Sequence, residues 1–210
     1  LYALGSKAFS KAVCFEPAPE NLRLLSLNLH ANGFEKTASI HAMAVSDRAG
    51  RARMELSAKN CGDHRLGSTP TAASGLTIEV EVETLDDILP KLSLKPSEIS
   101  VVWVDTQGYE ANVLAGAKTC IEAEVPFFIE FWPQALQQAG GYEKLLNLIE
   151  TYFDSFIEVR PNASLSRQPV KTLRNFARKF EGTIYHTDLL LLPKRSHGDL
   201  SEGNRGRGYA

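Results

Sequence analysis

Three carboxylates of this chain, Glu16, Asp105 and Glu130, lie at or near the ends of short apolar runs. Such runs are typical of buried strands, and ligands of parallel sheets bind at the carboxyl ends of the strands. A carboxylate at that edge can accept hydrogen bonds from sugar hydroxyls or take a proton from a substrate. The alternative for each is an acid that only leads the chain out to solvent.

Two of these positions predict specific chemistry. An acid after the second strand of a nucleotide-binding half-domain typically binds the hydroxyls of a ribose, and Glu16 fits this role. Asp105 leads into a helix through Gly108, which lets the backbone pass close to a ligand. Asp105 and Glu110 would then face one cleft, unless both only stabilise the helix start, where acids are favourable.

His64 is the histidine of a long loop over residues 57–75, which is rich in Gly, Ser, Thr and Asn. A loop of that length in a compact domain is more often functional than idle. His64 therefore either contacts the substrate or is structural. The histidines show no metal-ligand spacing, and Cys14, Cys61 and Cys120 include no C-x-x-C pair. We expect no metal site, no disulfide framework and a reducing, cytoplasmic location.

The elements that position these groups follow from the hydrophobic pattern. Apolar runs without alternation, separated by helical segments, predict a parallel sheet with helices on both faces. Alternating residues predict half-exposed strands at two places. The expected order is strand 11–16, helix 19–33, strand 39–45, half-exposed strands 51–56 and 78–82, a short helix capped by Thr84, strand 99–104, helix 109–118, strand 125–131, helix 142–152, strand 156–159, helix 170–180 and strand 187–192.

The composition narrows the functional classes. The 210 residues are 43% hydrophobic and 23% charged, with a formal net charge of −2. These values are typical of a folded, water-soluble domain, and they leave no basic field for nucleic acid or an anionic membrane. No apolar run approaches the roughly 20 residues that span a bilayer.

Several segments, taken together and in order, resemble the FkbM family of S-adenosylmethionine-dependent methyltransferases. The resemblance covers residues 1–132 well and the last third only loosely. The segments that carry it are Val13–Asn21, Ala44–Gly50, Thr84–Asp87, Asp105–Glu110, Val113–Ala117 and Phe128–Phe131.

The resemblance implies a class I methyltransferase fold. This is an α/β, Rossmann-like sheet, mostly parallel with an antiparallel last strand and with helices on both faces. It implies S-adenosyl-L-methionine as the cofactor, with Glu16 and Pro17 at its ribose and the segment of Ala44, Val45 and Asp47 beside its adenine. The stretch from Asp105 to Glu110 would lie at the methyl-transfer cleft.

The chain also departs from the family pattern. The glycine-rich first motif and the first strand are not in it, so we expect a domain over residues 1–193 that lacks both and binds cofactor poorly, followed by a disordered tail over 194–210. The family usually has Lys and Glu where this chain has Trp103 and Gln107.

From these observations we expect an O-methyltransferase for a small molecule with a hydroxyl group, such as a sugar or secondary metabolite. Asp105 is the expected base, with Glu110 second, and His64, Gln107 and Glu130 are expected to contact the substrate. A nicotinamide-dependent dehydrogenase would use the same ribose-binding acid. A non-catalytic relic or binding module is the other alternative. An antiparallel last strand would favour the methyltransferase.

Overall fold

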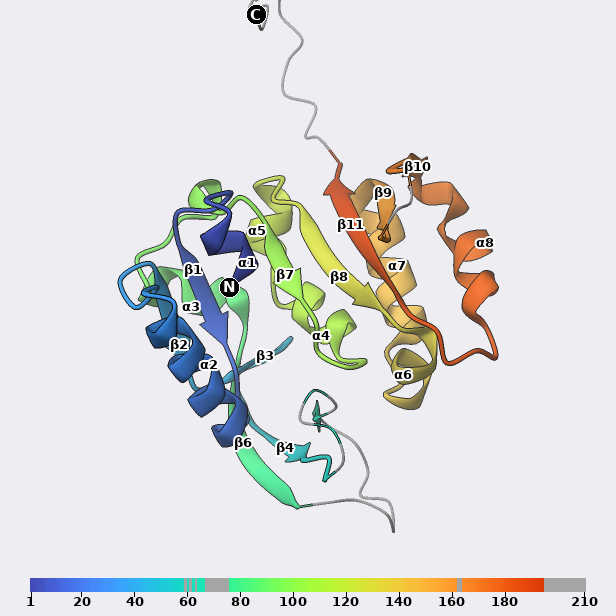
Figure 1. Ribbon diagram of the computed structural model, residues 1–210. Helices are drawn as coiled ribbons and strands as arrows, with labels where there is room; N and C mark the ends of the chain where they lie inside the picture. Colours follow the sequence, from blue (N-terminus) through green and yellow to red (C-terminus); the bar gives the residue numbers. More distant parts are fainter. Residues whose placement is uncertain (59, 61, 63, 67–75, 162–163, 195–210) are drawn as a thin grey trace, which may run out of the picture.

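The chain folds as a mixed α/β protein with several sheets (Figure 1). The computed structural model describes residues 1–58, 60, 62, 64–66, 76–161 and 164–194. The strands are β1 (Ala12–Phe15), β2 (Ala38–His41), β3 (Ala44–Val45), β4 (Gly50–Glu55), β5 (Arg65–Leu66), β6 (Thr77–Glu83), β7 (Val102–Val104), β8 (Phe127–Phe131), β9 (Phe153–Val159), β10 (Arg167–Pro169) and β11 (Thr187–Pro193).

Helices lie in five of the ten connections between consecutive strands. The α-helices are α1 (Tyr2–Gly5), α2 (Pro19–Ala31), α3 (Leu85–Lys91), α4 (Glu110–Ala115), α5 (Lys118–Glu122), α6 (Pro133–Gln138), α7 (Tyr142–Tyr152) and α8 (Leu173–Ala177). The 3-10 helices are η1 (Pro96–Glu98), η2 (Val170–Thr172) and η3 (Arg178–Phe180). The predicted cap of α3 is confirmed, because the Thr84 side chain accepts a hydrogen bond from the Asp87 N–H at 3.0 Å.

The largest sheet has the strand order β10-β9-β11-β8-β7. β7 and β8 are parallel, whereas β11 is antiparallel to both of its neighbours, β8 and β9. Figure 1 shows the arrowheads of β7 and β8 pointing down the view and that of β11 pointing up. The expectation of an antiparallel last strand is therefore confirmed.

The expectation of one mostly parallel sheet is wrong. β1 and β2 form a separate parallel pair, and β3-β6-β4-β5 form a mixed four-stranded sheet. The strand expected over 39–45 breaks in two, because the Met43 N–H bonds back to the His41 carbonyl (3.0 Å) in a tight turn. As a result β2 stays beside β1, and β3 pairs with β6.

The main core surrounds the five-stranded sheet. Aromatic side chains of β8 and β9 fill it, with Phe127, Phe131, Phe153 and Phe156 fully buried. α4, α7 and α8 pack their apolar faces against them. A smaller hydrophobic cluster around Met54 is formed mainly by side chains of the four-stranded sheet. The carboxyl ends of β7 and β8, where the sequence predicts the site, therefore lie on the main core.

Several local expectations need correction. β7 is shorter than the predicted strand over 99–104, and its Trp103 is 66% exposed, although it packs on Phe128 with 4.2 Å between ring centroids. The helix expected over 109–118 breaks at Gly116, where a Cβ atom would lie 2.0 Å from the Ser46 carbonyl oxygen. The loop over 57–75 contains β5, and α6 was not anticipated.

No helix in the described ranges is long and apolar enough to cross a bilayer. Of the tail predicted for residues 194–210, only Lys194 lies within the described residues. Its ammonium group donates to the carbonyl oxygens of Glu150 and Thr151 near the end of α7.

Candidate active site

The turn between β7 and α4 has the most constrained backbone of the site. Gln107 and Gly108 both adopt left-handed conformations, with φ of 54° and 100°. A Cβ atom on Gly108 would lie 2.7 Å from the carbonyl oxygen of Ala135 in α6. Glycine is therefore needed at 108 for its conformation and for the close approach of α6.

Glu110 holds this turn together from inside. Its Oε1 accepts hydrogen bonds from the N–H groups of Thr106 (3.0 Å) and Gly108 (3.1 Å) and from the Thr106 hydroxyl (3.1 Å). Burial raises the pKa of this carboxyl, and the backbone hydrogen bonds oppose the rise. Glu110 is only 1% exposed, so the expectation that it shares an open cleft with Asp105 is not met. It positions the turn instead.

Asp105 and Glu130 meet at the carboxyl edge of the sheet, as predicted from the ends of their strands. The Gln107 side-chain amide connects them, because Nε2 donates to Asp105 Oδ1 at 2.8 Å and to Glu130 Oε2 at 3.0 Å. Asp105 is exposed, whereas the side chain of Glu130 is only 13% exposed. One amide thus bridges the acids of two neighbouring strands.

β11 and the residue before it add two side chains that were not singled out from the sequence. Asp188 lies opposite Glu130 in the antiparallel register, and His186 Nε2 lies 3.8 Å from Glu130 Oε1. Burial raises the pKa of Glu130 to about 7, and the neighbouring carboxylates, Asp105 first among them, add to the rise. Burial and the charge of Asp105 also raise the pKa of Asp188. This group of acids can therefore hold a proton near neutral pH.

The same residues do not make a metal centre. Among the residues that the structure describes, no group of three or more His, Cys, Asp or Glu is arranged to hold a metal ion. Cys14 and Cys120 are free thiols, and Cys61 lies outside the described residues. Burial raises the pKa of Cys120 to about 11, so this thiol is a poor nucleophile.

The segment expected beside an adenine, Ala44 to Asp47, is held by the hydrophobic cores and by Lys144. Ala44 is buried in the core of the small sheet, and Val45 packs against the main core. The Asp47 carboxylate receives a hydrogen bond of 2.7 Å from Lys144 of α7. Burial alone would raise the pKa of Asp47, but the hydrogen bond and charge of Lys144, together with Arg48 and Ser46, outweigh it and lower the pKa. Lys144 therefore holds this segment in place.

Ser46 and Tyr109 tie the same segment to the β7 turn. Ser46 is buried, and its hydroxyl lies 3.0 Å from the Tyr109 hydroxyl. Tyr109 follows Gly108, so a single hydrogen bond links the end of β3 to the start of α4. The candidate adenine segment and the carboxylate edge consequently share one scaffold.

Glu16 follows β1 and is half-buried. Its Oε1 accepts a hydrogen bond from the Ala18 N–H at 2.8 Å, across Pro17. Its other carboxylate oxygen makes no hydrogen bond with the rest of the described chain. A partly buried carboxylate with one free oxygen, at the carboxyl end of a strand, suits a ligand hydroxyl.

His64 has a partner within its own loop, since Nδ1 accepts a hydrogen bond from the Ser57 N–H at 3.0 Å. Its neighbour Arg65 contacts a residue outside this loop. The Arg65 guanidinium lies 5.4 Å from the centre of the Trp132 ring, and that ring lies 5.9 Å from His186. Arg65 and Trp132, which the sequence did not reveal, therefore link the small sheet to the end of β8.

Comparisons with known proteins give these features a family. The sequence profile described as the methyltransferase FkbM domain matches residues 3–160. This chain belongs to the FkbM methyltransferase family. A comparison of folds finds the crystal structure of the methyltransferase FkbM from Methylobacillus flagellatus KT, with a TM-score of 0.47 and 15% identity. The match covers 90% of this chain and 39% of that one, so the chain spans about two fifths of that protein's length. A comparison with curated proteins finds no match.

Trp103 and Gln107, where the resemblance led us to expect Lys and Glu, have clear structural roles. Trp103 lies on the surface of β7 and covers Phe128 of the next strand. Gln107 supplies the two N–H donors that join Asp105 to Glu130. A carboxylate at 107 would repel both acids, so glutamine here stabilises the pair.

Proposed function

We propose that this FkbM domain is an S-adenosylmethionine-dependent O-methyltransferase that acts on a hydroxyl group of a sugar or a secondary metabolite. The observation that carries the proposal is the pair of carboxylates, Asp105 and Glu130, joined by Gln107 at the carboxyl edge of the sheet. Membership of the FkbM family supports methyl transfer as the reaction.

The residues around β1 and β3 fit the proposed cofactor. S-adenosylmethionine supplies a methyl group activated by its sulfonium sulfur. Glu16, with one carboxylate oxygen that has no hydrogen bond to the described chain, would bind the ribose hydroxyls beside Pro17. Ala44, Val45 and Asp47 would lie along the adenine, on a segment that Lys144 and Tyr109 fix.

The acceptor hydroxyl loses its proton as the new bond forms, and a nearby base must take that proton. A base works best when its pKa lies near the ambient pH. Glu130 meets this condition, because its pKa is about 7. From the sequence we expected Asp105 in this role. The burial and charge around Glu130 favour Glu130 as the base, with Asp105 raising its proton affinity and His186 beside it.

Calorimetry on the full gene product tests this proposal without knowledge of the acceptor. S-adenosylmethionine should bind saturably, one molecule per chain, and NAD should not bind. A labelled methyl group should then pass from S-adenosylmethionine to a member of a panel of sugars and hydroxylated metabolites.

Binding of NAD without binding of S-adenosylmethionine would replace the proposal with a dehydrogenase. Failure of both to bind would favour a non-catalytic module. Binding of S-adenosylmethionine together with methylation of a nitrogen or carbon atom would keep the cofactor and overturn the hydroxyl acceptor.

A further inference from the structure

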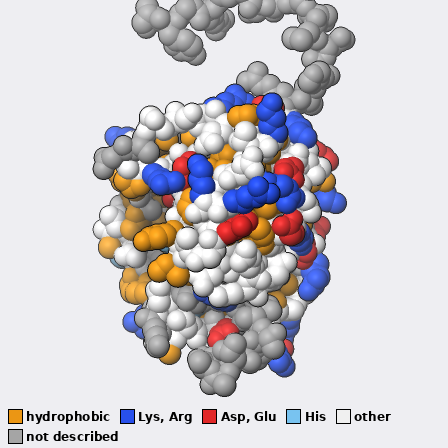
Figure 2. Space-filling view, turned by 90° about the vertical axis from the view of Figure 1, so that its right-hand side faces the viewer, with side chains coloured by type: hydrophobic (Ala, Val, Ile, Leu, Met, Phe, Trp, Pro, Cys, Tyr) orange, Lys and Arg blue, Asp and Glu red, His pale blue; other side chains and the backbone are white. Residues whose placement is uncertain are grey.

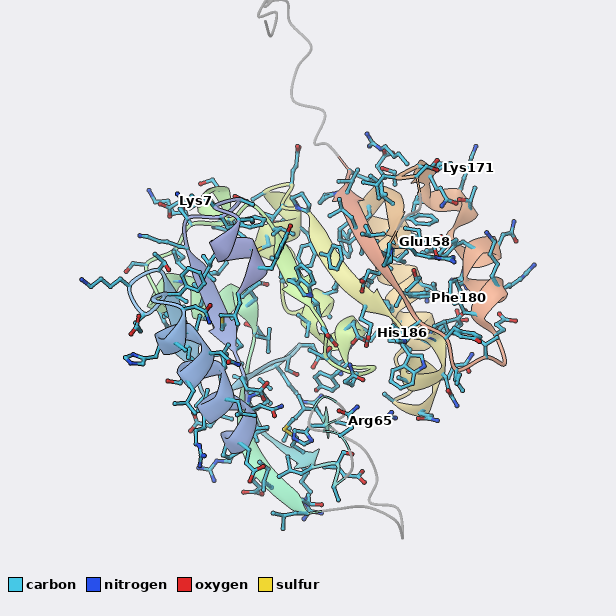
Figure 3. All side chains as sticks on the ribbon, in the orientation of Figure 1. Lys7, Arg65, Glu158, Lys171, Phe180 and His186 are labelled. Atoms are coloured by element: carbon cyan, nitrogen blue, oxygen red, sulfur yellow. The ribbon has the colours of Figure 1, made fainter. Side chains whose placement is uncertain are left out.

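A hollow of about 430 Å³ lies next to the carboxylates, on the far side of His186. Its walls are Arg160, which follows β9, Lys179 and Phe180 of η3, and Tyr185 and His186, which precede β11. Figure 3 shows Phe180 and His186 beside the chain that enters β11. A hollow of this size can hold a small organic group.

The charged side chains that line this hollow, Arg160 and Lys179, are basic, and none of the described residues that line it is acidic. Arg160 pairs with Glu158 through Nε and Nη2, which leaves its Nη1 group without a hydrogen bond to the described chain. The Lys179 ammonium lies 5.2 Å from the centre of the Phe176 ring and has no acidic partner within the described residues. Glu158 therefore offsets the charge of Arg160, whereas no acid of the described residues offsets that of Lys179.

The basic side chains of the neighbouring surface behave differently. Figure 2 shows Lys and Arg side chains in the upper half of this face with acidic side chains between them. Arg174 is an example, since it pairs with Glu143 at 2.9 Å and with Glu150 at 3.0 Å. Lys179 differs from Arg174, because no acidic side chain of the described residues pairs with it.

His186 connects the hollow to the proposed reacting centre. It lines the hollow, and its Nε2 lies 3.8 Å from Glu130 Oε1. His186 therefore separates the hollow from Glu130. A molecule whose negatively charged group lies in the hollow could extend past this one side chain and bring another atom to Glu130. Tyr185, 71% exposed, and the Phe180 ring would cover its apolar part.

We infer that this hollow binds a carboxylate or phosphate group of the methyl acceptor, so that the acceptor is an anionic hydroxy compound. The inference rests on the proposed function for the identity of the ligand as acceptor, but the anion site can be tested separately. Lys179 and the Nη1 group of Arg160 would bind the anion, and His186 would lie between it and Glu130.

The test follows the histidine ring resonances in carbon–proton NMR spectra of the full gene product. The His186 signal is assigned as the one that disappears in His186→Gln. Glucose 6-phosphate, glucuronate and uncharged glucose are added in turn. At least one of the two anionic sugars should shift the His186 signal saturably, and glucose should not. Which anion binds more tightly distinguishes phosphate from carboxylate.

Lys179→Gln and Lys171→Gln form a matched pair, because both lysines are exposed and Lys171 lies near the opposite end of this layer (Figure 3). Lys179→Gln should weaken anion binding by about fivefold or more, and Lys171→Gln should leave it unchanged. An unshifted His186 signal with both anions, or equal weakening by the two variants, would overturn the inference.

The outcome is separable from that of the proposed function. Anion binding that depends on Lys179, in a protein that does not bind S-adenosylmethionine, would leave the anion site standing and remove the methyl transfer. Methyl transfer without any response of His186 to the anions would support the proposed function and remove the anion site.

Discussion

The ends of β8 and β1 look alike in the sequence and differ in the structure. Both are apolar strands that lead to a glutamate. Glu130, at the end of β8, meets acids from both neighbouring strands, β7 and β11, and its pKa rises to about 7. Glu16, after β1, bonds to the backbone of its own turn, and β1 pairs only with β2 within the described chain. The neighbours across the sheet, more than the position along the chain, determine the chemistry of a strand-ending acid.

The largest expected effect is on turnover at the β8 end. Glu130→Gln keeps the shape of the side chain and removes the proton acceptor, so methyl transfer should fall by about 10²–10⁴-fold. Asp105→Asn should cost less, because Asp105 acts mainly by raising the proton affinity of Glu130. Glu122→Gln, at an exposed position of α5, is the control and should leave the rate unchanged. A larger loss in Asp105→Asn than in Glu130→Gln would return the role of base to Asp105.

The turn that holds Gln107 should be the most sensitive backbone of the site. Gly108→Ala adds a left-handed strain and a contact of 2.7 Å with Ala135, so the free energy of unfolding should fall by about 3 kcal/mol. Gly140→Ala has a similar φ, +71°, but meets no atom within 4 Å, and should cost about 1 kcal/mol. Urea denaturation of both variants measures the difference. Equal losses would show that the contact with α6 does not constrain the turn.

At the β1 end the expected effect is on cofactor affinity alone. A hydrogen bond to a charged group is worth roughly 1.5–3 kcal/mol, so Glu16→Ala should weaken S-adenosylmethionine binding about ten- to a hundredfold. Glu20→Ala, on the exposed first turn of α2, is the matched control. Calorimetry that finds the same affinity in both variants would remove Glu16 from the site.

The smallest expected effect is on stability as a function of pH. The pKa of Glu130 is raised from 4.5 to about 7, so between these values the folded protein keeps a proton that the unfolded chain has lost. The free energy of unfolding should therefore fall as the pH rises through this window. Glu130→Gln should remove about 1–2 kcal/mol of that fall and should be the more stable protein at pH 8. Parallel curves for the two proteins would contradict this.

Much of the fold could be predicted because local patterns determine it. The meeting of Asp105 and Glu130 followed from two apolar runs that end in acids. The antiparallel last strand could also have predicted two residues of the site, because such a strand begins at the edge of the sheet where its parallel neighbours end. That places His186 and Asp188 beside Glu130.

Other features depend on contacts that no local pattern contains. Nothing near Glu110 in the sequence indicates that its carboxylate turns inward to bond Thr106 and Gly108. The division of the stretch 39–45 between two sheets depends on β6, which lies more than thirty residues away in the chain. The contact of Arg65 with Trp132 likewise joins residues that are distant in sequence.

The central claim is that acids from three strands share a proton near neutral pH at Glu130. A titration of the Glu130 side-chain carboxyl carbon by carbon-13 NMR, assigned through Glu130→Gln, tests it most directly. The account predicts a midpoint near 7, and a lower midpoint in Asp105→Asn because a neighbouring charge is removed. A midpoint at the ordinary value of 4.5, unmoved by Asp105→Asn, would contradict it.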